Sequence, residues 1–205
     1  MALKIYGVAL SRAGRTLWMA EELGLPYEHV KTSFTRGTRT PEYLKINPNG
    51  HIPAIDEDGF TLWESMAINL YLAKKHGAGR LYPTRLEDEA RAWQWSFWGM
   101  TEVERPAMTA LFNRVVLDED KRDPLAAEAA EKALAAPLTV LDSVVGPGRY
   151  LLGGEFTVAD LNVAAILRNA HYARIDFDPF PNAATWLRAC LARPAAQKAQ
   201  QLQPD

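Results

Sequence analysis

The chain has 205 residues, of which 48% are hydrophobic and 10% aromatic, enough for one large domain or two small ones. A formal net charge of -2 and the lack of any Lys/Arg block argue against a nucleic-acid-binding protein. No apolar stretch has the length of a membrane span or resembles a signal peptide, so we expect a cytoplasmic protein without membrane contact. The single cysteine, Cys190, excludes an internal disulfide and fits a reducing compartment. The four scattered histidines lack metal-ligand spacing, so no metal site is expected.

The first part of the chain alternates strand-like and helix-like segments. The predicted order is strand, helix, strand, helix, strand, strand, helix, and the last of these helices covers 66–75. The first two strands flank a helix, so they should pair in parallel through a right-handed crossover. Gly24 is typical of a helix end, and Thr40 followed by Pro41 is typical of a helix start. These elements predict a small α/β domain.

Residues 47–65 carry the most informative pattern. Apolar runs at 52–55 and 60–63 flank the turn residues 57–59, which predicts a β-hairpin. Pro53 has no N–H to give to a sheet, so we expect it at the strand entry, in a cis peptide bond. The N–H and C=O of Ile52 would then remain available to an extended ligand.

Glu64 and Ser65 follow the hairpin and precede the helical run 66–75. Ser65 is predicted to be the N-cap of this helix, whose first N–H groups form an anion site. The carboxylate of Glu64 would receive an ammonium group, so the pair suits the zwitterionic head of an amino acid. Each residue alone is explained equally well by a purely structural role, in a turn or as a helix cap. Together they favour a peptide-like ligand.

Beyond residues 79–85, which we interpret as a linker, no strand-like alternation occurs. The prediction is therefore an α/β domain over 1–78 followed by an all-helical domain over 86–205. A long helix with a kink at Pro106 is expected over 86–116.

Further helices are expected over 125–145 and near 182–192, followed by a loosely held tail from Gln197. Thr157 and Asp160 form a capping box that fixes the start of a central helix. Asp160 is accordingly interpreted as a folding residue and not as a catalytic one.

The motifs, taken in order, resemble those of the cytosolic glutathione transferases. They are a serine-bearing loop before the first helix, Asn-Pro-x-Gly-x-Ile-Pro-Ala at the third strand, Glu-Ser before the third helix, and Phe-Thr-x-Ala-Asp in the helical part. The resemblance covers essentially the whole chain. It implies a thioredoxin-like domain that binds glutathione and an all-helical domain that contributes most of the pocket for a hydrophobic electrophile. It also implies a homodimeric detoxification enzyme with glutathione as co-substrate.

The resemblance assigns the catalytic role to Ser11. Its O–H would donate to the glutathione thiolate, and the following helix N-terminus would add positive potential. The backbone of Ile52 would pair with the cysteinyl part of glutathione, and Glu64 and Ser65 would hold its γ-glutamyl end. The full set implied for glutathione is Arg39, His51, Ile52, Pro53, Glu64 and Ser65. The residues that would reach the second-substrate pocket are Leu10, Trp98, Met108, Phe112 and His171.

Several alternatives remain open at the level of sequence. Tyr6 would be the fallback hydroxyl of a tyrosine-type site, although its spacing from the first helix is poor. No cysteine neighbours Ser11, which argues against thiol reduction through a mixed disulfide, whereas a glutathione peroxidase side activity is compatible with the site. A non-catalytic interaction module or ligand carrier of the same fold is the competing function. The joint presence of Ser11, Glu64 and Ser65 favours the enzyme.

Overall fold

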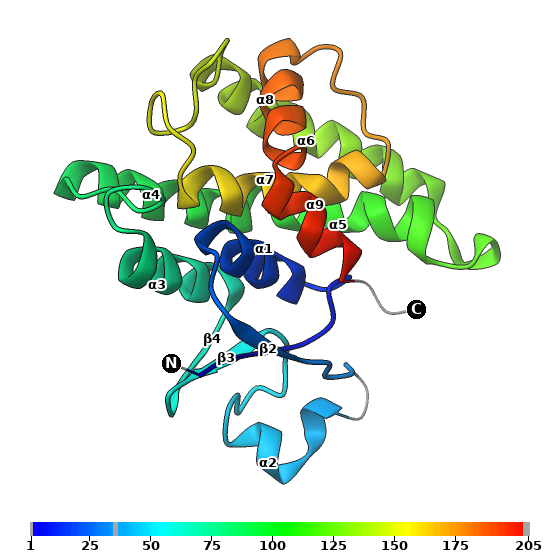
Figure 1. Ribbon diagram of the computed structural model, residues 1–205. Coiled ribbons are helices and arrows are strands. Elements are labelled where there is room, and N and C mark those ends of the chain that lie inside the picture. Colours follow the sequence, from blue (N-terminus) through cyan, green and yellow to red (C-terminus); the bar gives the residue numbers. More distant parts are fainter. Residues whose placement is uncertain (1, 35–36, 203–205) are drawn as a thin grey trace. The chain divides into compact units, whose positions relative to one another are not determined.

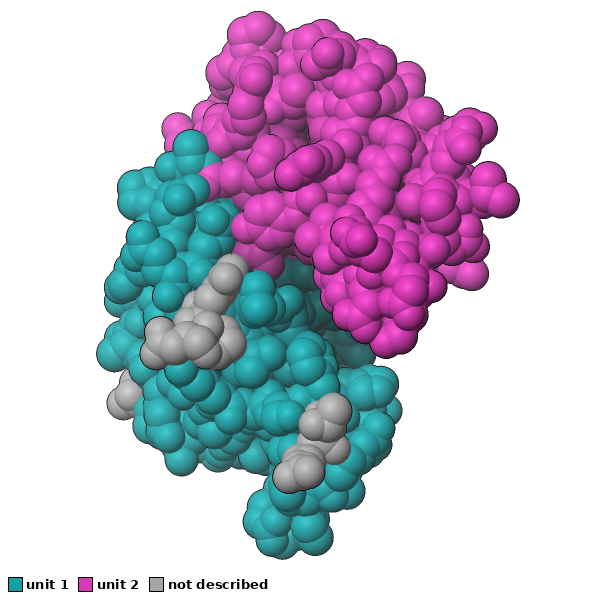
Figure 2. All heavy atoms as spheres, turned by 90° about the vertical axis from the view of Figure 1, so that its right-hand side faces the viewer, with its two compact units in different colours: residues 1–84, 192–205 teal, residues 85–191 magenta. Residues whose placement is uncertain are grey.

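The computed structural model describes residues 2–34 and 37–202 of the chain (Figure 1). The chain forms two compact units, coloured separately in Figure 2. Unit 1 contains residues 1–84 and 192–205, and unit 2 contains residues 85–191. Within the described ranges, no helix is both long enough and apolar enough to cross a membrane.

Unit 1 is built on a four-stranded sheet in the order β2-β1-β3-β4. β1 (Leu3–Tyr6) pairs in parallel with β2 (Tyr27–Val30) and antiparallel with β3 (Ala54–Glu57). β3 continues through a two-residue turn into β4 (Phe60–Trp63), its antiparallel neighbour. The predicted parallel pair and hairpin are both confirmed.

Three helices complete the α/β part of unit 1. α1 (Ala13–Leu23) and α3 (Ser65–Gly77) lie on one face of the sheet, and the short α2 (Pro41–Leu44) lies on the other (Figure 1). The predicted cap of α2 is present, because the Thr40 hydroxyl accepts a hydrogen bond from the third helical N–H. Gly24 ends α1 in the left-handed conformation, with φ of 64°. The thioredoxin-like order expected from the sequence is thus observed.

The core of unit 1 lies between the sheet and the pair α1 and α3. Five of its apolar side chains are completely buried, and each contributes about 1.5–3 kcal/mol relative to full exposure. They are Ile5, Leu17, Ile55, Ile68 and Leu72.

The last helix of the chain, α9 (Pro194–Gln201), packs on α1 and belongs to unit 1. Arg193 donates two hydrogen bonds of 2.6 and 2.8 Å to the carboxylate of Glu22, and Lys198 pairs with Glu21 at 2.7 Å. The sequence assigned this segment to the helical domain and expected a loosely held tail. Ion pairs between residues more than 170 positions apart leave no local pattern, which explains the difference.

Among the described residues, unit 2 contains helices joined by loops, with two isolated β-bridges within residues 146–153 and no strand. Its α-helices are α4 (Leu86–Trp98), α5 (Glu104–Leu111), α6 (Pro124–Val144), α7 (Val158–Tyr172) and α8 (Pro181–Leu191). α7 is the central helix, and most of its residues are buried.

The long helix predicted over 86–116 is interrupted by π-helical turns at Gly99–Val103 and Phe112–Val116. Gly99 lies so close to α7 that an added Cβ would come within 2.8 Å of Ile166. A proline disturbs a helix at the carbonyl four residues before it, and for Pro106 that residue is Glu102, which lies within the turn Gly99–Val103. The first interruption therefore falls where the kink expected from Pro106 would lie.

The predicted capping box at the start of α7 is confirmed. The carboxylate of Asp160 accepts hydrogen bonds from the backbone N–H groups of Thr157 and Leu151, and from the indole N–H of Trp186 at 3.0 Å. Burial raises the pKa of Asp160, while these hydrogen bonds oppose the shift. All of its contacts serve the fold, in agreement with the sequence interpretation.

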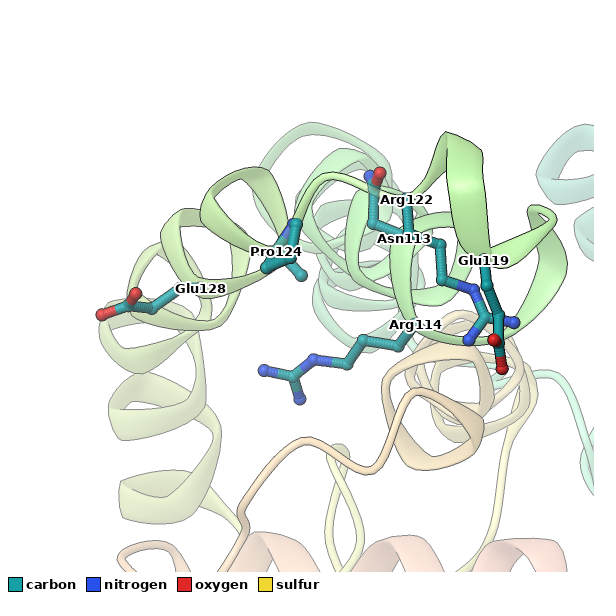
Figure 3. Close-up of a pocket in the computed structure, with 7 residues that line it drawn as sticks. Asn113, Arg114, Glu119, Arg122, Pro124 and Glu128 are labelled. Atoms are coloured by element: carbon teal, nitrogen blue, oxygen red, sulfur yellow. The ribbon is translucent and has the colours of Figure 1, made fainter.

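An open hollow lies on unit 2 beside the start of α6 (Figure 3). Two of the charged residues that line it form an ion pair or a hydrogen bond with other residues of unit 2. Arg114 pairs with Glu131, and the Arg122 guanidinium donates to the carbonyl of Leu117 at 2.8 Å. The residues that line the hollow are Asn113, Arg114, Glu119, Arg122, Pro124, Ala127 and Glu128.

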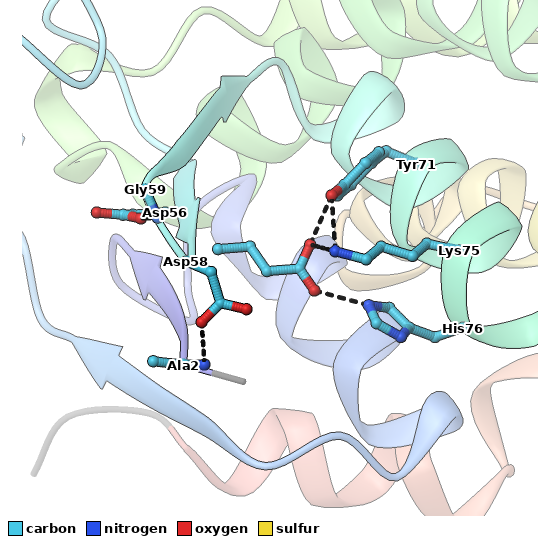
Figure 4. A network of polar contacts seen from close by, with 8 residues as sticks. Ala2, Asp56, Asp58, Gly59, Tyr71, Lys75 and His76 are labelled. Carbon is cyan, nitrogen blue, oxygen red and sulfur yellow. Dashed lines mark hydrogen bonds and ion pairs between the residues drawn. The ribbon is translucent and has the colours of Figure 1, made fainter.

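Glu57, at the end of β3, anchors the last turns of α3 to the sheet. Its side chain is completely buried and contacts the Tyr71 hydroxyl at 2.7 Å, the Lys75 ammonium at 3.0 Å and the His76 ring at 2.7 Å (Figure 4). Burial alone would raise the pKa of Glu57, but these hydrogen bonds and the Lys75 charge hold it below its ordinary value. The folded state therefore prefers the ionised carboxylate.

We predict that Glu57→Gln lowers the free energy of unfolding at pH 7 by about 1–3 kcal/mol, because Tyr71, Lys75 and His76 lose the buried carboxylate that they contact. Since the pKa is lower in the folded state, this stabilisation is present above the ordinary glutamate pKa of about 4.3 and is lost as the pH falls through the folded-state value. The difference between wild type and variant should shrink in acid. Urea unfolding followed by circular dichroism from pH 7 to pH 3 measures it.

The matched control is Glu28→Gln, because the Glu28 side chain is exposed and its ion pair with Lys4 is long, at 3.8 Å. This control should unfold within about 0.5 kcal/mol of wild type. Equal stability of Glu57→Gln and Glu28→Gln at pH 7 would contradict the anchoring role.

Candidate functional site

The loop after β1 presents Ser11 immediately before α1. The Ser11 hydroxyl donates to the carbonyl of Val8 at 2.7 Å and accepts from the N–H of Ala13 at 3.0 Å. It therefore satisfies one of the N–H groups that begin α1, while the residue at the N-cap position is Arg12. Ser11 is half-buried, so its hydroxyl lies at the boundary between the protein and the solvent.

Gly7 brings this loop against the segment before β3. With φ of 138°, it adopts a conformation that favours glycine, and an added Cβ would lie 2.5 Å from the Cβ of Ala13 and 3.2 Å from that of Ile52. The backbones at these three positions are therefore close. Ser11 and Ile52, predicted to act on the same ligand, belong to neighbouring segments.

The Ile52–Pro53 peptide bond is cis, as expected from the sequence. β3 begins only at Ala54, and within the described residues neither the N–H nor the C=O of Ile52 is hydrogen-bonded. Pro53 and the side chain of Ile52 are buried. This backbone edge matches the one predicted for an extended ligand.

The turn before Ile52 is held by two residues that the sequence analysis did not single out. The carbonyl of His51 accepts hydrogen bonds from the Tyr43 hydroxyl and from the Asn47 amide, both at 2.7 Å. The Asn47 side-chain oxygen accepts from the N–H of Asn49 at 3.0 Å. Asparagine before proline commonly forms such a turn, so Asn47 had a readable signal. Tyr43 had none.

Arg39 and His51 are brought together through Gly50. Gly50 has φ of 61°, and an added Cβ would meet the Arg39 guanidinium at 2.7 Å. Both Arg39 and His51 are exposed. The Arg39 guanidinium therefore lies against Gly50, the residue before His51.

Glu64 adopts an unusual backbone conformation, with φ of 72° and ψ of 113°. A non-glycine residue pays about 1–3 kcal/mol for such a conformation, which occurs mainly at functional sites. Its carbonyl accepts the first hydrogen bond of α3, from Ile68 at 2.9 Å, and its side chain is exposed. Glu64 is thus the N-cap residue of α3 but does not cap it with its side chain.

The prediction that Ser65 caps α3 is wrong. Ser65 occupies the first helical position and is buried, and its hydroxyl accepts a hydrogen bond of 3.5 Å from Arg15 of α1. The left-handed φ of Glu64 ends the extended chain one residue earlier than the serine suggested. The anion site expected at the start of α3 does not depend on this, because the first N–H groups of a helix lack intrahelical partners.

Tyr6 is poorly suited to the role of the catalytic hydroxyl. It lies within β1, opposite Ala54, and its ring contacts that of Tyr43 at a centroid distance of 5.9 Å. Burial raises the pKa of Tyr6, which makes its O–H a weaker donor to a thiolate. Ser11 remains the better candidate.

The residues predicted for the second substrate come from both units. Leu10 is 65% exposed beside Ser11 in unit 1. In unit 2, Trp98 contacts Trp95 edge-on, and Met108 accepts a hydrogen bond from Asn169. The other two, Phe112 and His171, are exposed, and none of the five lines the hollow on unit 2.

Comparison with known proteins matches the two parts of the chain to two related family models. Residues 1–74 match the N-terminal domain of glutathione S-transferases, and residues 124–189 match their C-terminal domain. Glutathione S-transferase GstB of Escherichia coli (strain K12) is 31% identical over 90% of either chain. Glutathione S-transferase 4 of Zea mays is 32% identical over 99% of this chain and 94% of its own.

Solved structures agree with this assignment. A theta class glutathione S-transferase from Xanthomonas axonopodis pv. citri, with glutathione bound, has a TM-score of 0.88, 28% identity and 96% coverage of both chains. Glutathione S-transferase-I bound with lactoylglutathione also has a TM-score of 0.88, with 27% identity over 98% of this chain and 99% of its own. Since both domains match in order and the relatives align over nearly their whole length, the chain belongs to the glutathione S-transferase family.

Proposed function

We propose that this protein is a glutathione transferase that joins the thiolate of glutathione to hydrophobic electrophiles. The observation that carries the proposal is the set of groups that unit 1 presents. A serine hydroxyl lies before α1, the backbone of Ile52 makes no hydrogen bond to the described residues, and Glu64 precedes α3 in a strained conformation. The relatives and the glutathione-bound neighbour structure support the same ligand.

Ser11 is proposed to stabilise the thiolate. A free thiol has a pKa of about 8.5, and lowering it by about two units takes roughly 3 kcal/mol of preference for the anion. Serine does not act as a base at neutral pH, but its O–H donates to sulfur, and the N-terminus of α1 adds positive potential. The sulfur then forms a bond to an electrophilic carbon, and the displaced electron pair leaves with the leaving group.

The remaining glutathione contacts follow the peptide from end to end. The Ile52 backbone beside Pro53 pairs with the cysteinyl residue, and Glu64 and Ser65 receive the ammonium and carboxylate of the γ-glutamyl residue. Arg39 and His51, which lie around Gly50, are placed near the glycine carboxylate. The exposure of both side chains and the closeness of Arg39 to Gly50 support this assignment.

The electrophile is proposed to be apolar. The side chains assigned to it are apolar or aromatic except for one histidine, and Leu10 beside Ser11 is largely exposed. They are Leu10, Trp98, Met108, Phe112 and His171. We further propose a cytoplasmic enzyme of detoxification, which agrees with a sequence that contains one cysteine, buried in α8.

We predict that Ser11→Ala binds glutathione nearly as well as wild type but raises the pKa of the bound thiol toward its free value. Turnover at neutral pH should fall at least tenfold, because one hydrogen bond to the anion is worth about 1.5–3 kcal/mol. Thiolate absorbance of the bound glutathione, titrated from pH 5 to pH 10, measures the shift directly. Glu64→Ala and Ser65→Ala should instead weaken glutathione binding.

Equal loss of affinity in all three variants would contradict this division of roles. A wild-type protein that does not bind glutathione, or binds it with an unshifted thiol pKa, would favour the competing function of a ligand carrier or interaction module.

We predict that Glu64→Gly and Glu64→Ala lose glutathione affinity to a similar extent but differ in stability. Glycine adopts φ of 72° without strain, whereas alanine does not. The free energy of unfolding should therefore be about 1 kcal/mol higher for the glycine variant than for the alanine variant. Urea unfolding of both variants, beside glutathione titrations, measures the two effects. Equal stability of the two variants would show that the Glu64 backbone is not strained.

We propose that the faces of α3 and α4 form the interface of a homodimer. Leu86, Trp93 and Phe97 of α4 are 72%, 40% and 63% exposed, and their spacing places them on one helix face. A continuous exposed apolar stripe is typical of a protein interface. A second copy of the chain would bury it.

We predict that wild type sediments as a dimer at micromolar concentration and that the double variant Trp93→Glu, Phe97→Glu sediments as a monomer. A glutamate in an apolar interface would lose its hydration when two copies associate. The apolar area buried in a small interface does not offset that free-energy cost. Leu125→Glu on α6 is the control, because Leu125 is also an exposed apolar residue, at 76%, but lies off the stripe. A monomeric wild type, or a dimeric double variant, would contradict the proposed interface.

A further inference from the structure

A buried polar layer lies where α1 meets α3. Arg15 is only 2% exposed, and its guanidinium donates to the Ser65 hydroxyl at 3.5 Å. The Asn69 amide donates to the Arg15 carbonyl at 3.4 Å, and Asn69 is completely buried. The contact joins the first turn of the helix that follows Ser11 to the first turn of the helix that follows Glu64.

A guanidinium in this position has an electrostatic consequence for a ligand. Burial of a cation is unfavourable unless an anion or several acceptors surround it. The start of α3 adds the positive end of a helix and N–H groups without intrahelical partners at the same place. Met66, which follows Ser65, is apolar and buried and contributes no charge of its own. An incoming carboxylate at the start of α3 therefore meets the positive end of the helix, and the Ser65 hydroxyl beside it is hydrogen-bonded by the Arg15 guanidinium.

The direction of the hydrogen bond determines what Ser65 offers. A serine hydroxyl has one hydrogen to donate and two lone pairs that accept. Because Arg15 donates to the Ser65 oxygen, the Ser65 hydrogen remains available to a ligand acceptor, and donation from a cation strengthens it as a donor. Arginine has only donors, so any contact between Arg15 and Ser65 has this direction, and the test below separates carboxylate recognition from a purely structural role.

We propose that Arg15 is a positioning residue for recognition of the ligand's α-carboxylate, acting through Ser65. The inference rests on the proposed function, since it assumes that the γ-glutamyl end of glutathione lies at the start of α3. Arg15 would orient the Ser65 hydroxyl and supply positive charge from beneath it without touching the peptide. It would have little effect on the thiol held by Ser11.

The test compares glutathione with an analogue whose γ-glutamyl residue lacks the α-carboxylate, 4-aminobutanoyl-cysteinylglycine. Dissociation constants for both are measured by calorimetry with wild type, Arg15→Lys and Arg15→Gln. Wild type should prefer glutathione, and each variant should lose about tenfold or more of that preference, chiefly by binding glutathione more weakly. The pKa of the bound thiol should stay at the wild-type value in the variants.

Arg80→Lys is the matched control, because Arg80 also contacts α1 from unit 1 but donates to the Glu22 carbonyl near its far end. It should keep the wild-type preference. In a double-mutant cycle, the effects of Arg15→Lys and Ser65→Ala on glutathione affinity should be non-additive, since both changes impair the same donor to the carboxylate. Two substitutions are made at Arg15 because either variant could fail to fold. Lysine keeps the charge and glutamine keeps an amide donor, and one folded variant is enough for the test.

An Arg15 variant that weakens both ligands equally would overturn the inference and leave a purely structural role. Additive effects in the cycle, or an unchanged preference for glutathione, would overturn it as well. If wild type binds neither ligand, the proposed function is overturned together with the inference. This outcome differs from failure of the inference alone, in which wild type still binds glutathione.

Discussion

Arg15 and Asn69 are buried between α1 and α3, and a buried charged or amide group must find partners inside the protein. This constraint fixes the two helices relative to each other more narrowly than apolar packing does, because hydrogen bonds depend on direction as well as distance. α1 begins two residues after Ser11, and α3 begins directly after Glu64. The contacts between the two helices therefore also set the distance from the Ser11 hydroxyl, the proposed thiolate-stabilising group, to the N-terminus of α3.

α3 is held at both ends by different chemistry. The Glu57 carboxylate contacts Tyr71, Lys75 and His76 in the later turns of α3. Arg15 contacts Ser65, the first residue of α3. A helix fixed at both ends resists the relaxation that would relieve the strained conformation of Glu64. The strain is therefore maintained by contacts at both ends of α3, one next to Glu64 and one at the last turns of the helix.

Much of unit 1 could be predicted because its signals are local. The order of strands and helices, the hairpin turn, the cis Ile52–Pro53 bond and the cap at Thr40 depend on neighbouring residues. The errors share a different cause: the cap of α3 depends on a backbone conformation, and the place of α9 depends on Arg193 reaching Glu22. The role of Tyr43 in fixing the His51 carbonyl is likewise a tertiary contact, which no sequence pattern shows.

The hydrogen bond that Ser11 makes in the structure bears on how it would act. Its O–H donates to the neutral carbonyl of Val8, and its oxygen accepts from the N–H of Ala13. Rotation about the Cβ–Oγ bond redirects the hydrogen toward a thiolate without disturbing the bond from Ala13. A hydrogen bond to an anion is roughly twice as strong as one to a neutral carbonyl, so the exchange favours the thiolate over the thiol. In the proposed role, the serine would thus discriminate between the two protonation states of its ligand, and this is the property that would lower the pKa of the bound thiol.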